Sequence, residues 1–480
     1  MNKKIIMYLL GWILNIEAVF MLLPCIVAVI YRESSGIWFL AIMAVCGAIG
    51  LFLTHKKPDN MVFFAREGFV SVALSWIVLS FFGALPFYLS GEIPVFEDAM
   101  FEVISGFTTT GASILSNVEG LSNCMLMWRS FTHWIGGMGV LVFILSILPL
   151  AGGYNMYIMK AESPGPSVGK LVPRVKSTAK ILYGIYFFMT VVEVVLLLIG
   201  GMPLFDALAT SFGTAGTGGF GIKNNSIAFY DSYYLQGVIT VFMILFGVNF
   251  NVYYLFLIHH AKDALHSEEA RTYLAIIGVA ILLITLNIRS GFDSLFAAFH
   301  HAAFQVASII TTTGFSTVDF NVWPEFSKGL LVLLMFIGAC AGSTGGGLKV
   351  SRVIILLKSV KKELSSLLHP RSVKIIKIEK KPVEHQVLRS INTFLAAYIT
   401  IFVLSMVLIS LDNFDFTTNF TAIAATFNNI GPGLAGVGPA ENFSAFSPLS
   451  KWVMMFDMLA GRLEVFPMLL LFTPSTWKRH

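Results

Sequence analysis

Four short stretches of this 480-residue chain end on a glycine and could bind a cation through their backbone. Two read TTTG, at residues 108–111 and 311–314, and the residues before them share alanine, phenylalanine, valine and serine at equal offsets. The other two, "GTAGTGG" (213–219) and "TFNNIG" (426–431), also lie between apolar segments. Glycine tolerates the backbone angles that turn a carbonyl inward. Four such turns around one axis could replace the hydration shell of a cation with carbonyl oxygens.

The chemistry expected of these turns comes from backbone oxygens rather than side chains. The residues expected to bind the cation are Thr109, Thr110, Gly111, Thr217, Gly218, Gly219, Thr312, Thr313, Gly314, Asn429, Ile430 and Gly431. The short helices before the turns would also direct their partially negative C-terminal ends at the cation. A single TTTG could be an ordinary helix C-cap, but four glycine-ended turns at matched places favour a common site.

The composition places these turns in a membrane protein. The chain is 56% hydrophobic and 12% charged, whereas an ordinary soluble domain has about 25% charged residues. Ten apolar segments are long enough to span a bilayer as helices. They lie near 8–31, 37–54, 68–88, 124–150, 181–201, 233–258, 272–288, 329–357, 390–411 and 449–474. Strand-type alternation is absent from the sequence, which argues against a transmembrane barrel.

The order of these segments predicts an all-α polytopic membrane protein built from repeats. After residue 68 the chain repeats one unit four times: span, short helix, glycine turn, span. Re-entrant segments of this kind occur where they are buried in protein or line a watery path. We therefore expect a pseudo-fourfold pore. The expected units are 1–65 (two additional helices), 66–160, 161–265, 266–370 and 371–480.

The distribution of Lys and Arg predicts the orientation. With the N-terminus inside, most basic residues fall on the inner side, above all in the stretch 349–389. The outer side then receives Arg32, Arg129, Lys223, Arg289, Lys328 and Lys451. The positive-inside rule thus predicts that both termini are cytoplasmic. The basic stretch 358–389 could also contact anionic membrane lipid or a cytosolic partner.

Several stretches together resemble the TrkH branch of the Trk/Ktr/HKT potassium transporter superfamily, over nearly the whole chain. They are "REGF" (66–69), "GALPF" (83–87), "GFTTTGA" (106–112), "WIGGMGV" (134–140), "FQVASIITTTGF" (304–315), "GACAGSTGGGLKV" (338–350), "NNIGPGL" (428–434) and "GRLEVF" (461–466). The resemblance implies four M1–P–M2 repeats that form a potassium uptake subunit in the bacterial inner membrane. It also implies a homodimer and a cytosolic TrkA-type partner with nucleotide-binding RCK domains.

The resemblance assigns the family's selectivity-filter glycines to Gly111, Gly219, Gly314 and Gly431. Family members with serine in the first repeat tend to admit sodium, so four glycines imply potassium selectivity. The second and fourth turns depart from TTTG. A sodium-permeable protein, or one coupled to sodium or protons, is the alternative within the same fold.

A gate is expected where the eighth apolar segment is interrupted by "GACAGSTGGGLK", residues 338–349. Its glycines cannot hold a continuous helix, so the stretch should be an intramembrane loop facing the pore. The expected gate residues are Gly338, Gly342, Ser343, Thr344, Gly345, Gly346, Gly347, Lys349 and Arg462. A charge within a span is a functional hypothesis by default, and the resemblance places Arg462 near this loop. We expect it to bind loop carbonyls; the alternative is an ion pair with Asp457 or Glu464.

Other chemistries find little support in the sequence. The spacing at 342–347 is Walker-like, but Leu348 precedes Lys349 and no strand comes before, so we expect no nucleotide and no organic cofactor in this chain. The sequence has no enzyme motif and no Cys/His spacing typical of a metal site. Potassium is expected only as the transported ion. We expect no enzymatic activity and no nucleic-acid partner. His133 is interpreted as structural or interfacial. Glu92, Glu97 and Asp98 either concentrate cations at the outer mouth or form a solvated rim.

Overall fold

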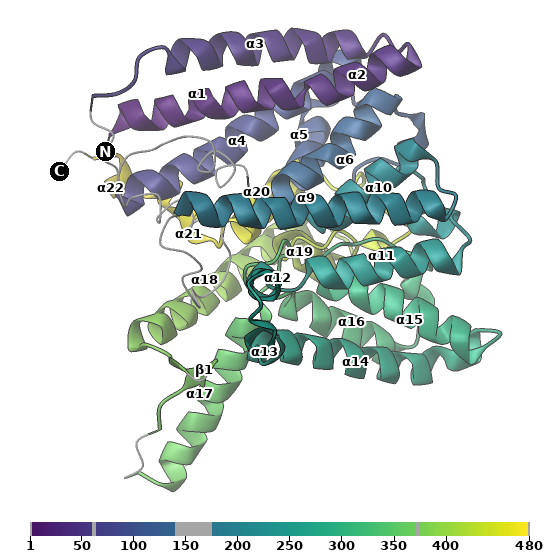
Figure 1. Ribbon diagram of the computed structural model, residues 1–480, viewed down its shortest axis with the longest axis vertical. Helices are drawn as coiled ribbons and strands as arrows, with labels where there is room; N and C mark the ends of the chain where they lie inside the picture. Colours follow the sequence, from purple (N-terminus) through teal and green to yellow (C-terminus); the bar gives the residue numbers. More distant parts are fainter. Residues whose placement is uncertain (1, 60–63, 140–174, 371–373, 380, 479–480) are drawn as a thin grey trace.

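The computed structural model describes residues 2–59, 64–139, 175–370, 374–379 and 381–478. Long helices lie side by side, and the two chain ends lie at the same end of the bundle (Figure 1). In the described part of the chain the strands are confined to one short antiparallel hairpin, β1 (Lys377–Ile378) and β2 (Lys381–Pro382). The all-α prediction is confirmed.

The helices follow the predicted order. The N-terminal helices are α1 (Lys3–Phe20), α2 (Leu22–Tyr31) and α3 (Gly36–Thr54). Next come α4 (Ala65–Ser90), α5 (Phe96–Phe107) and α6 (Asn123–Gly137), then α9 (Val175–Ile199), α10 (Leu204–Gly216), α11 (Tyr233–Phe246), α12 (Phe250–Leu257) and α13 (Ala261–Leu265). The third group is α14 (Glu268–Ile288), α15 (Leu295–Ile310), α16 (Glu325–Ile337) and α17 (Val350–Leu368). The last is α18 (His385–Ile409), α19 (Phe416–Phe427), α20 (Pro448–Arg462), α21 (Phe466–Phe472) and α22 (Pro474–Trp477).

Six helical stretches among the described residues are long and apolar enough to cross a membrane. They are Lys3–Tyr31, Gly36–Thr54, Ala65–Ser90, Lys180–Ile199, Glu268–Gly291 and His385–Asp412. Each coincides with a predicted span. The predicted span 124–150 is described only as far as residue 139, and its remainder lies outside the described residues.

Two spans that we expected to be continuous are broken, which corrects the prediction. The segment 233–258 bends by 89° between α11 and α12, where Asn249 caps the new helix by accepting from the Asn251 N–H. The segment 449–474 stops at Arg462 because Glu464 and Val465 have left-handed backbones, with φ of 60° and 68°. Hydropathy alone does not detect either break, since the residues on both sides remain apolar.

The four helix groups contact each other in a cycle. In each group a short helix that ends on a glycine turn packs against the first α-helix after the glycine turn of the group before it. The contacting pairs are α6 with α10, α11 with α15, α16 with α19, and α20 with α5. The last pair joins the fourth group to the first, so the cycle closes, as a pseudo-fourfold arrangement requires.

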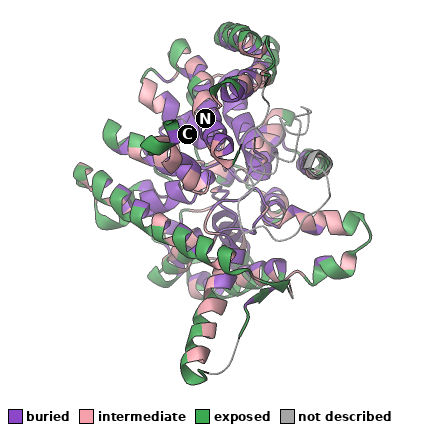
Figure 2. Ribbon diagram, turned by 90° about the vertical axis from the view of Figure 1, so that its left-hand side faces the viewer, coloured by how far each residue is buried: buried purple, intermediate pink, exposed green. Residues whose placement is uncertain are grey.

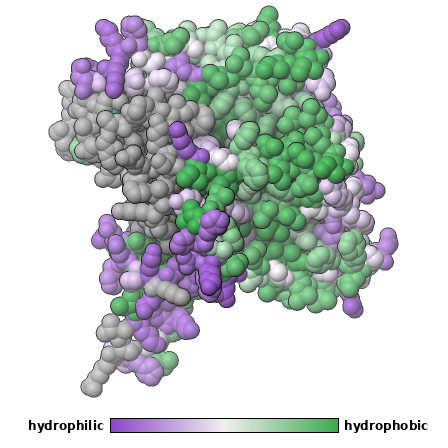
Figure 3. Space-filling model, in the orientation of Figure 1, coloured by the Kyte–Doolittle hydropathy of each residue, from purple (hydrophilic) through white to green (hydrophobic). Residues whose placement is uncertain are grey.

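The surface and the interior divide as they do in a membrane protein. Hydrophobic side chains cover a broad face of the bundle (Figure 3), while buried residues gather around the short helices at its centre (Figure 2). Exposed apolar areas this large are suited to lipid rather than water. Two of the basic residues predicted for the outer side, Arg129 and Lys451, are buried within α6 and α20, where each pairs with an acid.

Candidate functional site

Four backbone turns of the same geometry follow the short helices α5, α10, α15 and α19. We call them turn 1 (108–111), turn 2 (216–219), turn 3 (311–314) and turn 4 (428–431). In each, the final glycine has a positive φ, and so does the residue two positions before it. The φ values are 55° and 79° in turn 1, 53° and 74° in turn 2, 59° and 87° in turn 3, and 55° and 101° in turn 4.

The hydrogen bonds of the four turns repeat as well. The N–H of the residue before each glycine donates to a carbonyl five residues earlier, at 2.8 or 2.9 Å. The donors are Thr110, Gly218, Thr313 and Ile430, and the acceptors are Ser105, Gly213, Ser308 and Ala425. Different side chains therefore produce one backbone conformation four times.

The turns form a closed ring. A β-carbon added to Gly111 would overlap the carbonyl oxygen of Gly218, the residue before the glycine of turn 2. In the same way, a β-carbon on Gly219 would meet the carbonyl oxygen of Thr313, one on Gly314 that of Ile430, and one on Gly431 that of Thr110. Each glycine thus contacts the same carbonyl of the next turn, and turn 4 contacts turn 1. The close approach explains why the position must be glycine.

A cavity of about 110 Å³ lies at one end of this ring. All four turn glycines line it, together with residues that follow them, such as Ala112, Phe220 and Pro432. The cavity therefore meets the ring where the chain leaves the turns, and it could admit an ion or a few waters. Residues before the glycines must lie toward the other end.

The side chains that hold the turns differ from turn to turn. In turns 1 and 3 two threonine hydroxyls bond each other, Thr108 with Thr110 at 2.8 Å and Thr311 with Thr313 at 2.7 Å. In turn 4 the amide of Asn429 donates to the Thr110 hydroxyl and to the Met458 carbonyl, both at 2.9 Å. The threonine and asparagine side chains therefore brace turns 1, 3 and 4.

The glycine-rich loop (338–349) separates α16 from α17 and contacts the other end of the ring. The Gly346 N–H donates to the Thr312 hydroxyl at 2.6 Å, and the Gly347 N–H donates to the Asn428 carbonyl at 3.1 Å. Both acceptors precede the turn glycines, so the loop and the cavity lie at opposite ends of the ring. The loop begins at Gly338 and ends at Lys349, both with positive φ.

Arg462 connects this loop to the first helix group. Its guanidinium donates to the Thr344 carbonyl at 2.8 Å and to the Gly136 and Gly137 carbonyls at 2.5 and 2.9 Å. The two acids considered as alternative partners have contacts of their own. Glu464 pairs with Arg352, and Asp457 accepts from the Ser405 hydroxyl at 2.8 Å.

The remaining loop residues are fixed mainly by the bend between α11 and α12. The Thr344 hydroxyl donates to the Phe246 carbonyl at 3.2 Å, and the Phe250 N–H donates to the Gly342 carbonyl at 3.0 Å. The Ser343 hydroxyl donates to the Cys340 carbonyl at 2.7 Å. The amino group of the buried Lys349 donates to the Gly345 carbonyl, so it closes the loop on itself.

The sequence reasoning missed Glu269 as a contact of the loop. Its carboxylate accepts from the N–H of Ala341 at 2.7 Å and of Ser351 at 3.1 Å, one near each end of the loop. It lies in the first turn of α14, where an acid is typical of any helix, so no sequence signal distinguished it.

The acids expected at the outer mouth are partly structural: Glu92 accepts from Ser122, and Asp98 pairs with Lys451.

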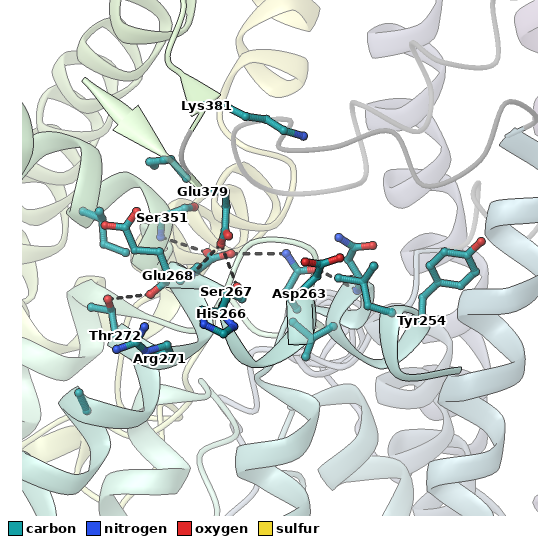
Figure 4. A pocket seen from close by; sticks show the side chains of 18 of the residues that line it. Tyr254, Asp263, His266, Ser267, Glu268, Arg271, Thr272, Ser351, Glu379 and Lys381 are labelled. Atoms are coloured by element: carbon teal, nitrogen blue, oxygen red, sulfur yellow. Dashed lines mark hydrogen bonds between the residues drawn. The ribbon is translucent and has the colours of Figure 1, made fainter. Parts of the chain in front are cut away.

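A larger cavity, of about 1030 Å³, has Glu269 and Ser351 among its lining residues. Residues of α12, α14, α17 and the β hairpin line it, and the side chains of Ser267, Glu268 and Glu379 gather at one side (Figure 4). Glu379 accepts from the Ser267 hydroxyl at 3.0 Å and from the Glu268 N–H at 2.8 Å. The hairpin is therefore tied to the helix start that holds the loop.

Comparisons with known proteins agree with this architecture. The model of the TrkH family, described as a cation transport protein, matches residues 36–479. The chain is 38% identical to the Trk system potassium uptake protein TrkH of Escherichia coli K12 over the full length of both chains. It is 32% identical to the Trk system potassium uptake protein TrkG of the same strain over 99% of each. The crystal structure of the potassium transporter TrkH from Vibrio parahaemolyticus superposes with a TM-score of 0.89, at 35% identity, and each chain is covered completely.

Proposed function

Because the chain belongs to the TrkH family of cation transport proteins, we propose that it takes up potassium across the membrane through the ring of four turns. The observation that carries the proposal is the fourfold backbone pattern, in which each turn glycine contacts the same carbonyl of the next turn. Such a ring can replace the hydration shell of potassium with the carbonyl oxygens of turns 1 to 4. The relatives named as potassium uptake proteins support potassium as the ion.

The glycine-rich loop and Arg462 form the gate in this proposal. The loop crosses the end of the ring opposite the 110 Å³ cavity, and Arg462 fastens it to α6. A guanidinium at this place repels cations that have passed the ring. Opening then requires the loop to leave its contacts with Thr312 and Asn428.

The wider assembly follows the family. The functional units would be the expected ranges 1–65, 66–160, 161–265, 266–370 and 371–480. The boundary at 160/161 falls on residues outside the described part, and the boundary at 370/371 adjoins such residues. The protein would act as a homodimer in the bacterial inner membrane, with both termini cytoplasmic. A TrkA-type nucleotide-binding partner would control the gate, since the relatives are named as components of a Trk system.

The test is cation flux into liposomes that contain the chain, alone and with a TrkA-type partner. Potassium, rubidium, sodium and lithium are compared for wild type and for Gly314→Ser, whose β-carbon would overlap the Ile430 carbonyl oxygen. We expect selective potassium and rubidium flux in wild type. In the variant the preference for potassium over sodium should fall about tenfold, which corresponds to about 1.4 kcal/mol.

Gly278→Ser is the matched control, because a β-carbon on Gly278 of α14 meets no atom within 4 Å. It should behave as wild type. Equal sodium and potassium flux in wild type would instead favour the sodium-permeable alternative. If folded protein with partner conducts no cation, the ring is a scaffold and the proposal is wrong.

A further inference from the structure

Turn 2 lacks the side-chain supports that hold the other turns. Its residues Gly216 and Gly218 occupy the places of the paired threonines in turns 1 and 3. In turn 3 the hydroxyl of Ser308 also donates to the carbonyl of Phe315, the residue after the glycine, at 2.6 Å. The residue equivalent to Ser308 in α10 is Gly213, which has no side chain. Turn 2 keeps its backbone bond from the Gly218 N–H to the Gly213 carbonyl and a bond from the Thr217 hydroxyl to the Gly216 carbonyl. The support that the missing side chains would give comes from a neighbouring helix.

Arg129 of the neighbouring helix α6 holds the segment that follows turn 2. Its guanidinium donates to the Gly221 carbonyl at 2.7 Å, and the guanidinium carbon lies 3.5 Å from the centroid of the Phe220 ring. The His133 ring stacks on Phe220 with a centroid distance of 4.2 Å. The Arg129 guanidinium and the His133 imidazole are both too close to the Phe220 centroid to lie on the same face of its ring. The Phe220 ring is therefore enclosed between them.

His133 also supports turn 2 directly. A β-carbon added to Gly218 would overlap the His133 imidazole, so the ring lies against the backbone of turn 2. The imidazole thus contacts both Gly218 and Phe220, before and after the turn glycine. Turn 2 has no paired threonines like those of turns 1 and 3, and the side chains of Arg129 and His133 in α6 support it instead.

Glu102 of α5 supplies the charge that Arg129 needs in this buried place. The two side chains are 0% and 3% exposed, and Glu102 Oε1 lies 2.5 Å from Arg129 Nε. The same carboxylate accepts from the hydroxyl of Ser113 and from the N–H of Ile114, both at about 3.0 Å. Ser113 and Ile114 follow turn 1, so one ion pair ties the exits of turns 1 and 2 together.

We propose that Arg129, through its contacts with Phe220 and Gly221 and its ion pair with Glu102, is a positioning residue that sets the cation selectivity of the ring. This inference rests on the proposed function. Selectivity in a carbonyl ring depends on where the oxygens stand. A planar guanidinium can stack on an aromatic ring while it donates to a carbonyl and a carboxylate, whereas an ammonium cannot.

The central variant is Arg129→Lys, which keeps the positive charge and the pairing with Glu102 but loses the planar contact with Phe220. Arg129→Gln is the stronger change and leaves the Glu102 carboxylate unpaired, so it can prevent folding. The matched control is Lys451→Gln, which breaks another largely buried ion pair, with Asp98 of α5. Folding is checked for all three by the detergent-solubilised thermal midpoint.

The measurements are the potassium-to-sodium permeability ratio in liposomes and the difference between thermal midpoints in KCl and NaCl. We expect the permeability ratio to fall about fivefold or more in Arg129→Lys. The midpoint difference should shrink, because the ring no longer distinguishes the two ions. Lys451→Gln should keep both values while its midpoint falls in either salt.

Folded Arg129→Lys with an unchanged permeability ratio and midpoint difference would overturn the inference. An equal loss of selectivity in Lys451→Gln would also overturn it, since the effect would then come from general destabilisation. Failure of the proposed function is recognised separately, because wild type and Lys451→Gln would then show no preference for potassium.

Discussion

Each turn places one residue that is not glycine in the left-handed region: Thr109, Thr217, Thr312 and Asn429. For a β-branched residue this conformation is a genuine outlier, and each instance costs on the order of 1–3 kcal/mol. The hydrogen bonds of the residue that follows, to a carbonyl five positions back, hold each turn in place. Strain that appears four times at equivalent positions is consistent with a conformation selected for the carbonyls it displays.

Arg462→Ala tests the gate at the scale of one residue. The substitution removes three hydrogen bonds to carbonyls of the loop and of α6 and a positive charge from the end of the ring. Basal potassium flux without partner should rise about tenfold, since a barrier lowered by about 1.4 kcal/mol gives that factor. Flux into liposomes under a potassium gradient measures it.

Arg389→Ala, an exposed arginine of α18, is the matched control and should not change basal flux. If Arg462→Ala folds and its basal flux stays at the wild-type level, Arg462 is not a barrier. Its guanidinium would then serve only to join α20 to α6.

The sequence predicts some of these residues and not others. The turn glycines are predictable because glycine tolerates the positive φ that these turns require. For Arg129 the sequence predicts only a place toward the outer side, and its partner Glu102 is 27 positions away. A contact between residues this far apart depends on how α5 packs against α6, and a single sequence does not contain that information.

At the scale of elements, two helices expected to be straight are broken, and both breaks serve the glycine-rich loop. The bend between α11 and α12 provides the Gly247 carbonyl, which accepts from the Cys340 N–H at 3.0 Å. The end of α20 at Arg462 places its guanidinium against the Thr344 carbonyl. The interruption of the eighth span was predictable from its glycines. The other two breaks depend on contacts with the loop itself.

Glu269 of α14 holds the glycine-rich loop near both of its ends in the observed conformation. Removing its carboxylate in Glu269→Ala leaves the N–H groups of Ala341 and Ser351 without their acceptor, at a cost of about 1–3 kcal/mol per buried group. Because that cost falls on the closed conformation, basal flux should rise and control by the partner should weaken. Hydrogen exchange of peptides that cover residues 339–351 should accelerate at the same time.

Glu363→Ala on the exposed side of α17 controls for the loss of an acid near this end of the molecule. It should change neither flux nor exchange. Faster exchange without any change in flux in Glu269→Ala would mean that the loop loosens without opening the path, and that the gate lies elsewhere.

At the scale of the whole molecule, the ring must close between the first and last helix groups, which are more than 300 residues apart in sequence. The contacts that join them near the ring include the bond from the Asn429 amide to the Thr110 hydroxyl at 2.9 Å, and a β-carbon on Gly431 would approach the Thr110 carbonyl oxygen. The cyclic order of the groups was predictable from the repeat, because four equivalent units can satisfy equivalent contacts only by closing.

The ion pair of Asp98 with Lys451, at 2.5 Å, joins the first and last helix groups near the starts of α5 and α20, away from turns 1 and 4. Its side chains are 20% and 8% exposed. Removing one partner should therefore cost about 1–3 kcal/mol, less than the 3–5 kcal/mol of a fully buried pair. Asp98→Asn and Lys451→Gln should each lower the thermal midpoint, and the double variant should lose less than their sum because the two effects share one interaction.

Lys328→Gln provides the comparison, since the Lys328–Glu325 pair lies within one helix and its glutamate is 89% exposed. Such a pair contributes about 0–1 kcal/mol and joins no separate groups. If Asp98→Asn and Lys451→Gln are no more destabilising than Lys328→Gln, or if their effects simply add, the pair does not stabilise the contact between the first and last helix groups. Closure would then depend on the packing of α5 against α20 and on the contacts between turns 1 and 4, and Asn429→Ala should be the more destabilising change.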